Sequence, residues 1–290
     1  MDIKELDLQY SPSRWSKRLS ADDVISQHIN VATAASNEAK SNIPCELGVP
    51  YGTREGEKLD IFGGDSLPKE SPILVYIHGG YWSSLDRTIS SYCVKPFYAA
   101  GIRVVVVGYD LAPKVKLGEI IEEIQNAACY ILDLASNLGS KSVWFSGHSA
   151  GGHLSAMLLS RAWMDSLSAT HKVLLKGLIL ISGVYDLTPL LPIYVNEPLE
   201  MTRAEAVKWS PMYFDISPNA ANVKIHVAVG ENDSPEFQRQ SKDFSNLLIS
   251  KGFSCDFQLV PVVDHFDAVE KLNHDDYILT QKIINLIKQN

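Results

Sequence analysis

SVWFSGHSAGGHLSAMLLSR, residues 142–161, joins a strand-like run to a helix-like run through a turn rich in glycine. The turn carries the pattern G-x-S-x-G at residues 147–151, with the apolar run VWF before it and the run HLSAMLL after it. A sharp strand-to-helix turn leaves little room beside the serine, and glycines at 147, 151 and 152 remove the Cβ atoms that would clash. The segment therefore predicts that Ser149 is a nucleophile raised above the edge of a sheet, at the N-terminus of a helix that favours developing negative charge.

The segments on both sides of this turn alternate between strand-like and helix-like patterns. Residues 103–108, RVVVVG, are typical of a strand buried on both faces, and residues 117–138 repeat apolar side chains at helical spacing. The other predicted strands are 58–62, 72–77, 142–146, 176–182, 223–229 and 256–260, and the other predicted helices are 151–161, one after residue 229, and 277–287. This alternation predicts an α/β fold with a mostly parallel central sheet covered by helices on both faces.

A serine hydroxyl is a weak nucleophile at neutral pH and needs a base within hydrogen-bonding reach. His265 lies in the segment VPVVDHF, directly after the predicted strand 256–260. His274 follows a few residues later and is the second choice. We predict that His265 takes the hydroxyl proton of Ser149.

The base in turn needs an acid that orients its ring, and in folds with this turn the acid falls between the serine and the histidine in the sequence. Asp233 lies in the segment VAVGEND, in the loop after the predicted strand 223–229. Glu231 in the same loop remains an alternative, whereas Asp264 is less suited because a neighbour in sequence seldom points at the histidine ring. The segment DSPE at 233–236 also resembles a helix cap followed by proline, so a capping role for Asp233 stays open. The order serine, aspartate, histidine predicts a serine hydrolase of the α/β-hydrolase fold.

The loop after the predicted strand 72–77 carries IHGGYW at residues 77–82. Many lipases and esterases have an HGGG-type loop at this point, and its N–H groups bind the oxyanion of the tetrahedral intermediate. We predict that the N–H groups of Gly80 and Tyr81, together with that of Ala150, form this oxyanion hole. His78 is expected to brace the loop through hydrogen bonds rather than to take part in the chemistry.

Two segments do not follow the alternation. Residues 1–40 precede the sheet, and residues 184–222 join two predicted strands and contain five prolines. Long connections of this kind are uncommon unless they are functional, and open α/β sheets bind ligands at the carboxyl ends of their strands. We expect one domain spanning residues 1–290, in which both segments form a small lid over those strand ends.

The composition limits the partners of this chain. Its 290 residues carry a formal net charge of −8, which argues against nucleic acid or an anionic membrane as a partner. The N-terminal residues lack the apolar run of a secretory signal, and no apolar stretch is long enough to span a bilayer, so a soluble intracellular protein is expected. The cysteines are far apart and form no CxxC pair, which favours reduced thiols and no metal site; they are Cys45, Cys93, Cys129 and Cys255.

HGGYW at residues 78–82 resembles the HGGxW signature of the kynurenine formamidases, also called arylformamidases. QYSPSRW at 9–15 is similar to the N-terminus of animal members of that family, whereas YDLAP at 109–113 and GVYDL at 183–187 resemble the related hormone-sensitive-lipase-like esterases. Tyr81 replaces the third glycine of HGGG, a departure that fits formamidases and counts against a general lipase. These similarities span residues 9–266 and so cover most of the chain.

The resemblance implies hydrolysis of N-formyl-L-kynurenine to L-kynurenine and formate, a step of tryptophan breakdown. It also implies a cytosolic enzyme that needs no cofactor and forms a homodimer. Such a substrate requires a small acyl side and an aromatic slot, and Trp82 and Tyr185 are the candidates for the slot, with ordinary core packing as the alternative. A carboxylesterase acting on small acyl esters is the second interpretation, and an inactive fold used only for binding is the third.

Overall fold

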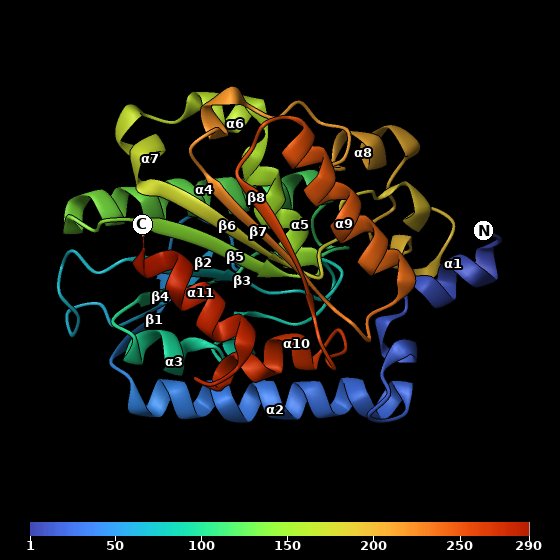
Figure 1. The fold of residues 1–290 in the computed structure, drawn as a ribbon, viewed down its shortest axis with the longest axis horizontal. Coiled ribbons are helices and arrows are strands. Elements are labelled where there is room, and N and C mark those ends of the chain that lie inside the picture. Colours follow the sequence, from blue (N-terminus) through green and yellow to red (C-terminus); the bar gives the residue numbers. More distant parts are fainter. Residues whose placement is uncertain (290) are drawn as a thin grey trace.

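The computed structural model describes residues 1–289 and is built around one eight-stranded sheet (Figure 1). The strands are β1 (Cys45–Pro50), β2 (Lys58–Phe62), β3 (Ile73–Ile77), β4 (Arg103–Val107), β5 (Val143–His148), β6 (Leu175–Ile181), β7 (Lys224–Gly230) and β8 (Cys255–Val260). They follow the order β1-β2-β4-β3-β5-β6-β7-β8 across the sheet. The β1–β2 and β2–β4 pairs are antiparallel and all other pairs are parallel, which confirms the predicted, mostly parallel α/β architecture.

Helices cover both faces of this sheet. They are α1 (Ile3–Gln9), α2 (Ala21–Asn42), α3 (Val94–Ala99), α4 (Leu117–Leu138), α5 (Ala150–Ala156), α6 (Arg161–Ser166), α7 (Ala169–Leu174), α8 (Arg203–Lys208), α9 (Pro235–Ser250), α10 (Asp267–Glu270) and α11 (Ile278–Lys288). Helices α4, α5 and α9 share one apolar core with the sheet, whereas α3, α10 and α11 share another (Figure 1). The strand period of two explains this division, because Val105 and Val107 of β4 join the first core and Val104 and Val106 join the second.

The predicted elements agree with the structure over most of the sheet and diverge in particular places. The predicted strand 58–62 and helix 117–138 coincide with β2 and α4. The helix predicted over 151–161 is shorter, because α5 ends at Ala156 and a 3-10 turn over Met157–Leu159 leads to Ser160, which bridges to Ile216. The edge strand β1 has no predicted counterpart, since its half-exposed residues lack a regular apolar alternation.

The first 42 residues, called here the N-terminal segment, contain the long helix α2, for which no helix was predicted. Ser20 caps this helix by accepting a hydrogen bond from the N–H of Asp23. Its buried face is made mainly of small residues, including Ala32, Ala35 and Ala39, which belong to the core on the α3 side. In Figure 1 the helix runs along the bottom of the molecule, outside α3 and α10. Alanines give a weak apolar signal in sequence but allow a helix to pack closely.

Residues 184–222 form an ordered connection rather than an open loop. The connection consists of three 3-10 turns and α8, whose N-terminus carries a capping box between Thr202 and Glu205. Ser210 Oγ accepts a hydrogen bond from the N–H of Leu187 at 2.7 Å. Hydrogen bonds within the connection thus replace those of regular secondary structure.

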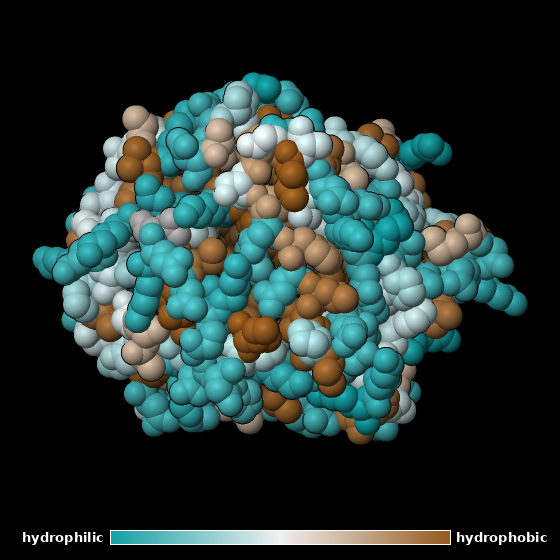
Figure 2. All heavy atoms as spheres, viewed as in Figure 1, coloured by the Kyte–Doolittle hydropathy of each residue, from teal (hydrophilic) through white to brown (hydrophobic). Residues whose placement is uncertain are grey.

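The surface on the face of Figure 1 is mainly hydrophilic, and its hydrophobic residues form separate small groups (Figure 2). Within residues 1–289, every helix is too short or too polar to cross a lipid bilayer.

Candidate active site

Ser149 stands on the tight turn between β5 and α5, as the sequence predicts. Its backbone has φ 54° and ψ −118°, a conformation that residues other than glycine rarely adopt. Hydrogen bonds on both sides hold it, from the Ser149 N–H to the carbonyl of Ile181 at 2.9 Å and from the His153 N–H to the carbonyl of Ser149 at 3.0 Å. At Gly151, an added Cβ would lie 2.0 Å from the carbonyl oxygen of Ile77, so only glycine fits there. The strained turn is therefore fixed by its surroundings.

His265 and Asp233 meet at the carboxyl edge of the sheet, in the loops after β8 and β7. Nδ1 of His265 lies 2.8 Å from Oδ2 of Asp233, and both side chains are almost completely buried. The other carboxylate oxygen of Asp233 accepts the N–H of Ser234 at 2.9 Å. Glu231, the alternative acid, instead accepts the N–H of Val262 at 2.9 Å. Asp233 is thus the acid that contacts the histidine ring.

The cap of the following helix explains why Asp233 is available for this contact. Ser234 is the N-cap of α9, accepting the N–H of Phe237 at 3.3 Å, and Pro235 is the first helical residue. The capping role considered for Asp233 therefore belongs to its neighbour. His274, the second choice for the base, is exposed and does not line the pocket that contains His265.

A second histidine, His148, contacts the backbone of His265. Its Nε2 lies 2.8 Å from the carbonyl oxygen of His265, and the two rings are 4.5 Å apart. Burial, together with the nearby His265, holds the pKa of His148 well below its ordinary value. A neutral His148 that donates from Nε2 then braces the loop without adding positive charge beside His265.

The HGGYW loop follows β3 and lies against the turn of Ser149. An added Cβ at Gly79 would be 2.9 Å from the carbonyl oxygen of His148 and 3.1 Å from Cβ of Ser149. Gly80 has φ 104° and Tyr81 has φ 47°. Within residues 1–289, no protein group accepts a hydrogen bond from the N–H of Gly80, Tyr81 or Ala150. These three donors are free for a ligand oxygen, as an oxyanion hole requires.

His78 braces this loop from beneath. Its Nδ1 bonds to the carbonyl oxygen of Gly79 at 2.8 Å, and its ring stacks on that of Tyr109 with centroids 4.3 Å apart. Burial lowers the pKa of His78 to about 4, so the ring is neutral at physiological pH. The bracing role expected for His78 agrees with these contacts.

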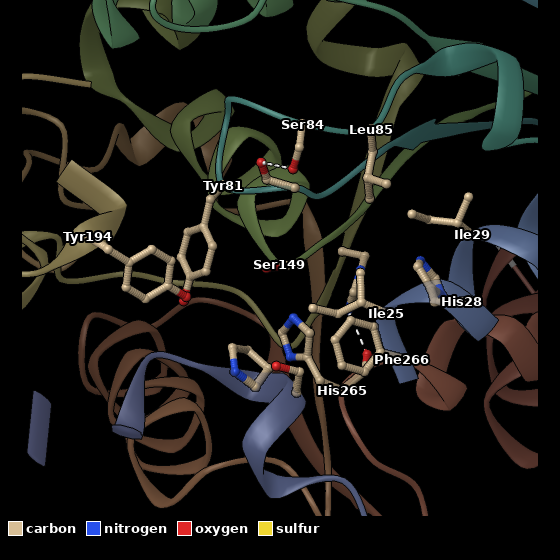
Figure 3. Close-up of a pocket in the computed structure, with 14 residues that line it drawn as sticks. Ile25, His28, Ile29, Tyr81, Ser84, Leu85, Ser149, Tyr194, His265 and Phe266 are labelled. Carbon is tan, nitrogen blue, oxygen red and sulfur yellow. Dashed lines mark hydrogen bonds between the residues drawn. The ribbon is translucent and has the colours of Figure 1, made fainter. Parts of the chain in front are cut away.

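Ser149 and His265 line one pocket, which is shown in Figure 3. Tyr81 and Tyr194 lie on one side of Ser149, and Ile25, His28 and Ile29 of α2 lie on the other side (Figure 3). The remaining lining residues are Pro12, Ser13, Gly80, Ser84, Leu85, His148 and Phe266. The described residues contain no hydrogen bond between Ser149 Oγ and His265. In unliganded hydrolases this contact often tightens only when substrate binds.

The prediction that Trp82 and Tyr185 form an aromatic slot is wrong. Both side chains are fully buried, and neither lines the pocket. The Trp82 ring packs edge-on against His153 at 5.0 Å, and Tyr185 stacks on Phe244 at 4.4 Å. Successive positive φ angles at Tyr81 and Trp82 accompany a sharp bend, after which Tyr81 borders the pocket and Trp82 enters the core. Both aromatic residues are instead packed in the core, which was the alternative interpretation.

The N-terminal segment, which was expected to lie over the strand ends, borders the pocket, although none of its residues was predicted to be part of the site. Tyr10 Oη donates to Glu236 of α9 at 3.1 Å and accepts from Gln240 at 2.7 Å. The carbonyl oxygen of Tyr10 accepts hydrogen bonds from the hydroxyl groups of Tyr81, at 2.8 Å, and Tyr194, at 3.2 Å. One residue thus connects the helix behind Asp233 to two tyrosines of the pocket.

Arg18 ties the same segment to the histidine loop. Its Nε lies 2.8 Å from Asp264 Oδ2, its Nη2 lies 3.1 Å from Oδ1, and its Nη1 contacts Glu270 at 3.0 Å. Burial disfavours the ionised form of Asp264, but hydrogen bonds from Arg18 and Ser16 outweigh it and hold the pKa of Asp264 well below its ordinary value. Asp264 therefore binds the N-terminal segment and not the ring of His265, as its position beside the histidine suggested.

Comparisons with known proteins agree with this geometry. Residues 74–266 match the family model of the alpha/beta hydrolase fold. The chain is 40% identical to a kynurenine formamidase of Danio rerio, over 99% of this chain and 97% of the relative. It is 30% identical to a kynurenine formamidase of Drosophila melanogaster, over 98% and 97% of the two chains.

A solved structure of similar fold is an esterase of Pyrobaculum calidifontis, with 20% identity and a TM-score of 0.73 over 99% of this chain and 96% of that one. At this level of identity the likeness shows the fold alone. The relatives that match over almost the whole chain identify the family, because their similarity includes the N-terminal segment that borders the pocket. The chain belongs to the kynurenine formamidase family of α/β hydrolases.

Proposed function

We propose that the chain hydrolyses the formamide bond of N-formyl-L-kynurenine and releases L-kynurenine and formate. The observation that carries the proposal is one pocket in which Ser149 meets His265, itself bonded to Asp233, in a chain whose full-length relatives are kynurenine formamidases. Acyl transfer of this kind needs a nucleophile, a base with an orienting acid, and donors for an oxyanion. Each has a candidate at the carboxyl edge of this sheet.

In the first half-reaction, Ser149 Oγ attacks the formyl carbon while Nε2 of His265 takes the hydroxyl proton. Nδ1 of His265 keeps its proton throughout and donates a hydrogen bond to Asp233, 2.8 Å away. This contact fixes the tautomer in which Nε2 has a free lone pair, and it stabilises the imidazolium that forms.

The negative oxygen of the tetrahedral intermediate binds to the N–H groups of Gly80, Tyr81 and Ala150. One donor of this type is worth about 3–4 kcal/mol of transition-state stabilisation. The C–N bond then breaks, and His265 returns its proton to the arylamine nitrogen, so that L-kynurenine leaves. Water attacks the formyl-serine with His265 as base, and formate and the free serine are released.

We also propose that residues 1–40 and 184–222 act as a lid over this site. Pro12 and His28 from the first segment and Tyr194 from the second border the pocket, which supports this role. Limited proteolysis with and without saturating L-kynurenine tests the idea. Protection of both segments by the ligand is expected, and an unchanged cleavage pattern in both would contradict it.

The proposal extends to a cytosolic, single-domain enzyme that forms a homodimer, as the family resemblance implies. Light scattering on purified protein is expected to give twice the mass of one chain, and a monomer at micromolar concentration would argue against the dimer. Fractionation of cells is expected to find the protein in the cytosol, and recovery with membranes or organelles would contradict that location.

The decisive experiment compares kcat/KM for N-formyl-L-kynurenine with the values for acetyl and butyryl esters of one phenol, with Ser149→Ala as control. We expect a strong preference for the formyl amide. Faster cleavage of the butyryl ester, with little formamidase activity, would replace the proposal by a carboxylesterase that uses the same residues.

A further inference from the structure

The pocket offers few charged groups to an amino acid substrate. Within residues 1–289, its lining includes no aspartate, glutamate, lysine or arginine, and its titratable side chains are two tyrosines and three histidines. Nδ1 of His265 faces Asp233, and Nε2 of His148 faces the carbonyl oxygen of His265, so both rings serve the catalytic loops. His28 is the remaining histidine of the lining, and it takes no part in the proposed reaction steps.

The ring of His28 is held in place from several sides. Its Nδ1 lies 2.9 Å from Glu270 Oε1, and Arg18 Nη1 holds the other oxygen of the same carboxylate at 3.0 Å. The rings of Phe266 and Tyr92 lie 5.3 Å and 6.3 Å from the His28 ring. His28 is only 4% exposed, so this orientation is fixed by buried contacts. A carboxylate behind a histidine fixes both the tautomer and the direction of the opposite ring nitrogen.

The opposite nitrogen, Nε2, has no hydrogen-bond partner within residues 1–289. The ring itself borders the pocket, on the α2 side of Ser149 (Figure 3). A polar atom without a partner in the protein finds one in water or in a ligand. His28 thus has one ring nitrogen without a protein partner and stands at the wall of the pocket.

We propose that Nε2 of His28 binds the α-carboxylate of the amino acid head group of the substrate. This inference rests on the proposed function and extends it from the scissile bond to the head group. Because Nδ1 faces the Glu270 carboxylate, it carries a proton. In the complex the ring lies between two carboxylates: it donates from Nδ1 to Glu270 and from Nε2 to the head group, and hydrogen bonds to carboxylates are charge-assisted. An aryl formamide without the head group makes no such contact.

The lining favours the carboxylate over the α-ammonium group as the partner of His28. An ammonium group needs several acceptors or a negative charge, and no acidic side chain lines the pocket within the described residues. Glu270 is already shared between His28 and Arg18. The ammonium group therefore keeps its water molecules at the mouth of the pocket, and the carboxylate is recognised inside.

Binding measurements test this assignment without depending on turnover. Titration calorimetry compares three ligands: L-kynurenine, kynuramine, which lacks only the carboxylate, and 2-aminoacetophenone, which lacks the whole head group. The proteins are the unmodified chain, His28→Ala, His28→Gln and His274→Ala, an exposed histidine outside the pocket that serves as the matched control.

We expect His28→Ala to weaken L-kynurenine binding by roughly 10- to 100-fold, the usual effect of losing a hydrogen bond to a charged group. Binding of kynuramine and 2-aminoacetophenone stays within about twofold, because neither ligand reaches His28 through a carboxylate. His28→Gln, which keeps an N–H donor but no charge, gives an intermediate loss. His274→Ala leaves all three affinities unchanged.

Three outcomes would overturn the proposal. Equal weakening of all three ligands by His28→Ala would make His28 a packing residue of the pocket wall. Weakening of both L-kynurenine and kynuramine, with 2-aminoacetophenone unaffected, would identify the ammonium group as the partner. Unchanged binding of L-kynurenine would show that the head group lies elsewhere.

The proposed function fails by a different measurement. If the unmodified chain does not hydrolyse N-formyl-L-kynurenine, the reaction is wrong, whatever the titrations show. If it does hydrolyse this substrate and His28→Ala changes no affinity, only the head-group assignment is wrong.

Discussion

The loops at the carboxyl edge of the sheet and the N-terminal segment form two walls of the same pocket, but only the loops carry sequence motifs that predict catalytic residues. Ser149, Asp233 and His265 each follow a recognisable strand, and each was predicted as a site residue from the segment around it. The N-terminal segment borders the pocket through residues such as His28, yet it carries no motif for catalysis. Short local patterns therefore indicate the candidate catalytic residues, whereas the shape of the site depends on contacts between residues more than two hundred positions apart.

Ser149→Ala gives the largest expected effect and tests the first of these walls. Loss of the nucleophile lowers kcat by roughly 10⁴- to 10⁶-fold, with the fold intact. Stopped assays with N-formyl-L-kynurenine measure the loss, and circular dichroism checks the fold. Substantial remaining activity in a folded variant would remove Ser149 from the mechanism.

The contrast between two acids in one loop gives the next largest effect. Asp233→Asn lowers kcat by about 10⁴-fold, because the amide favours the wrong tautomer of His265. Glu231→Gln is the matched control, since Glu231 bonds to the backbone of Val262 and not to the histidine. The pair is compared by kcat on one substrate, and a larger loss in Glu231→Gln would reverse the assignment of the acid.

Arg18→Ala tests the second wall through stability. The substitution leaves Asp264 and Glu270 buried without their shared cation, and we expect the free energy of unfolding to fall by roughly 3 kcal/mol, the low end for breaking a buried ion pair. Lys17→Ala is the control in the same segment, because Lys17 makes only an exposed contact with Asn232. Urea denaturation measures both variants, and equal small losses would show that the Arg18 contacts contribute little.

The pH dependence of the same comparison follows from Asp264. Its pKa in the folded protein lies well below the ordinary value, so its ionised form stabilises the fold at pH values above the ordinary pKa of about 4. This contribution is lost as the pH falls from there toward the folded-state pKa. The stability difference between the unmodified chain and Arg18→Ala should therefore be full at pH 6 and shrink below pH 4, as measured by urea titrations at each pH. A difference that grows on acidification would contradict this cause.

Tyr10→Phe gives the smallest expected effect. The change removes the hydroxyl that joins Glu236 and Gln240, but it keeps the carbonyl that anchors Tyr81 and Tyr194. We expect a loss of about 1 kcal/mol in the free energy of unfolding, the usual value for one buried hydrogen bond, with kcat/KM nearly unchanged. A large fall in kcat/KM would show that the hydroxyl, and not the carbonyl, positions the pocket wall.

Sequence patterns predicted the elements whose residues carry strong periodic signals. The valines of β4 and the apolar repeat of α4 are examples, and both were located closely. Signals were weak where burial uses small residues or only half of a strand, as in α2 and β1. Trp82 shows another limit, because adjacent aromatic residues in one loop cannot be divided between pocket and core before the backbone bend is known.

The sequence by itself determined the fold class, the nucleophile turn, and the chain order of the candidate acid and base, because each depends on a few neighbouring residues with strict steric or chemical requirements. Only the tertiary structure decided that Asp233 and not Glu231 faces His265, that Trp82 and Tyr185 are core residues, and which residues of the N-terminal segment border the pocket. These outcomes depend on side-chain directions and on long-range contacts such as Arg18 with Asp264. Such contacts form only when distant segments pack together, so no local pattern encodes them.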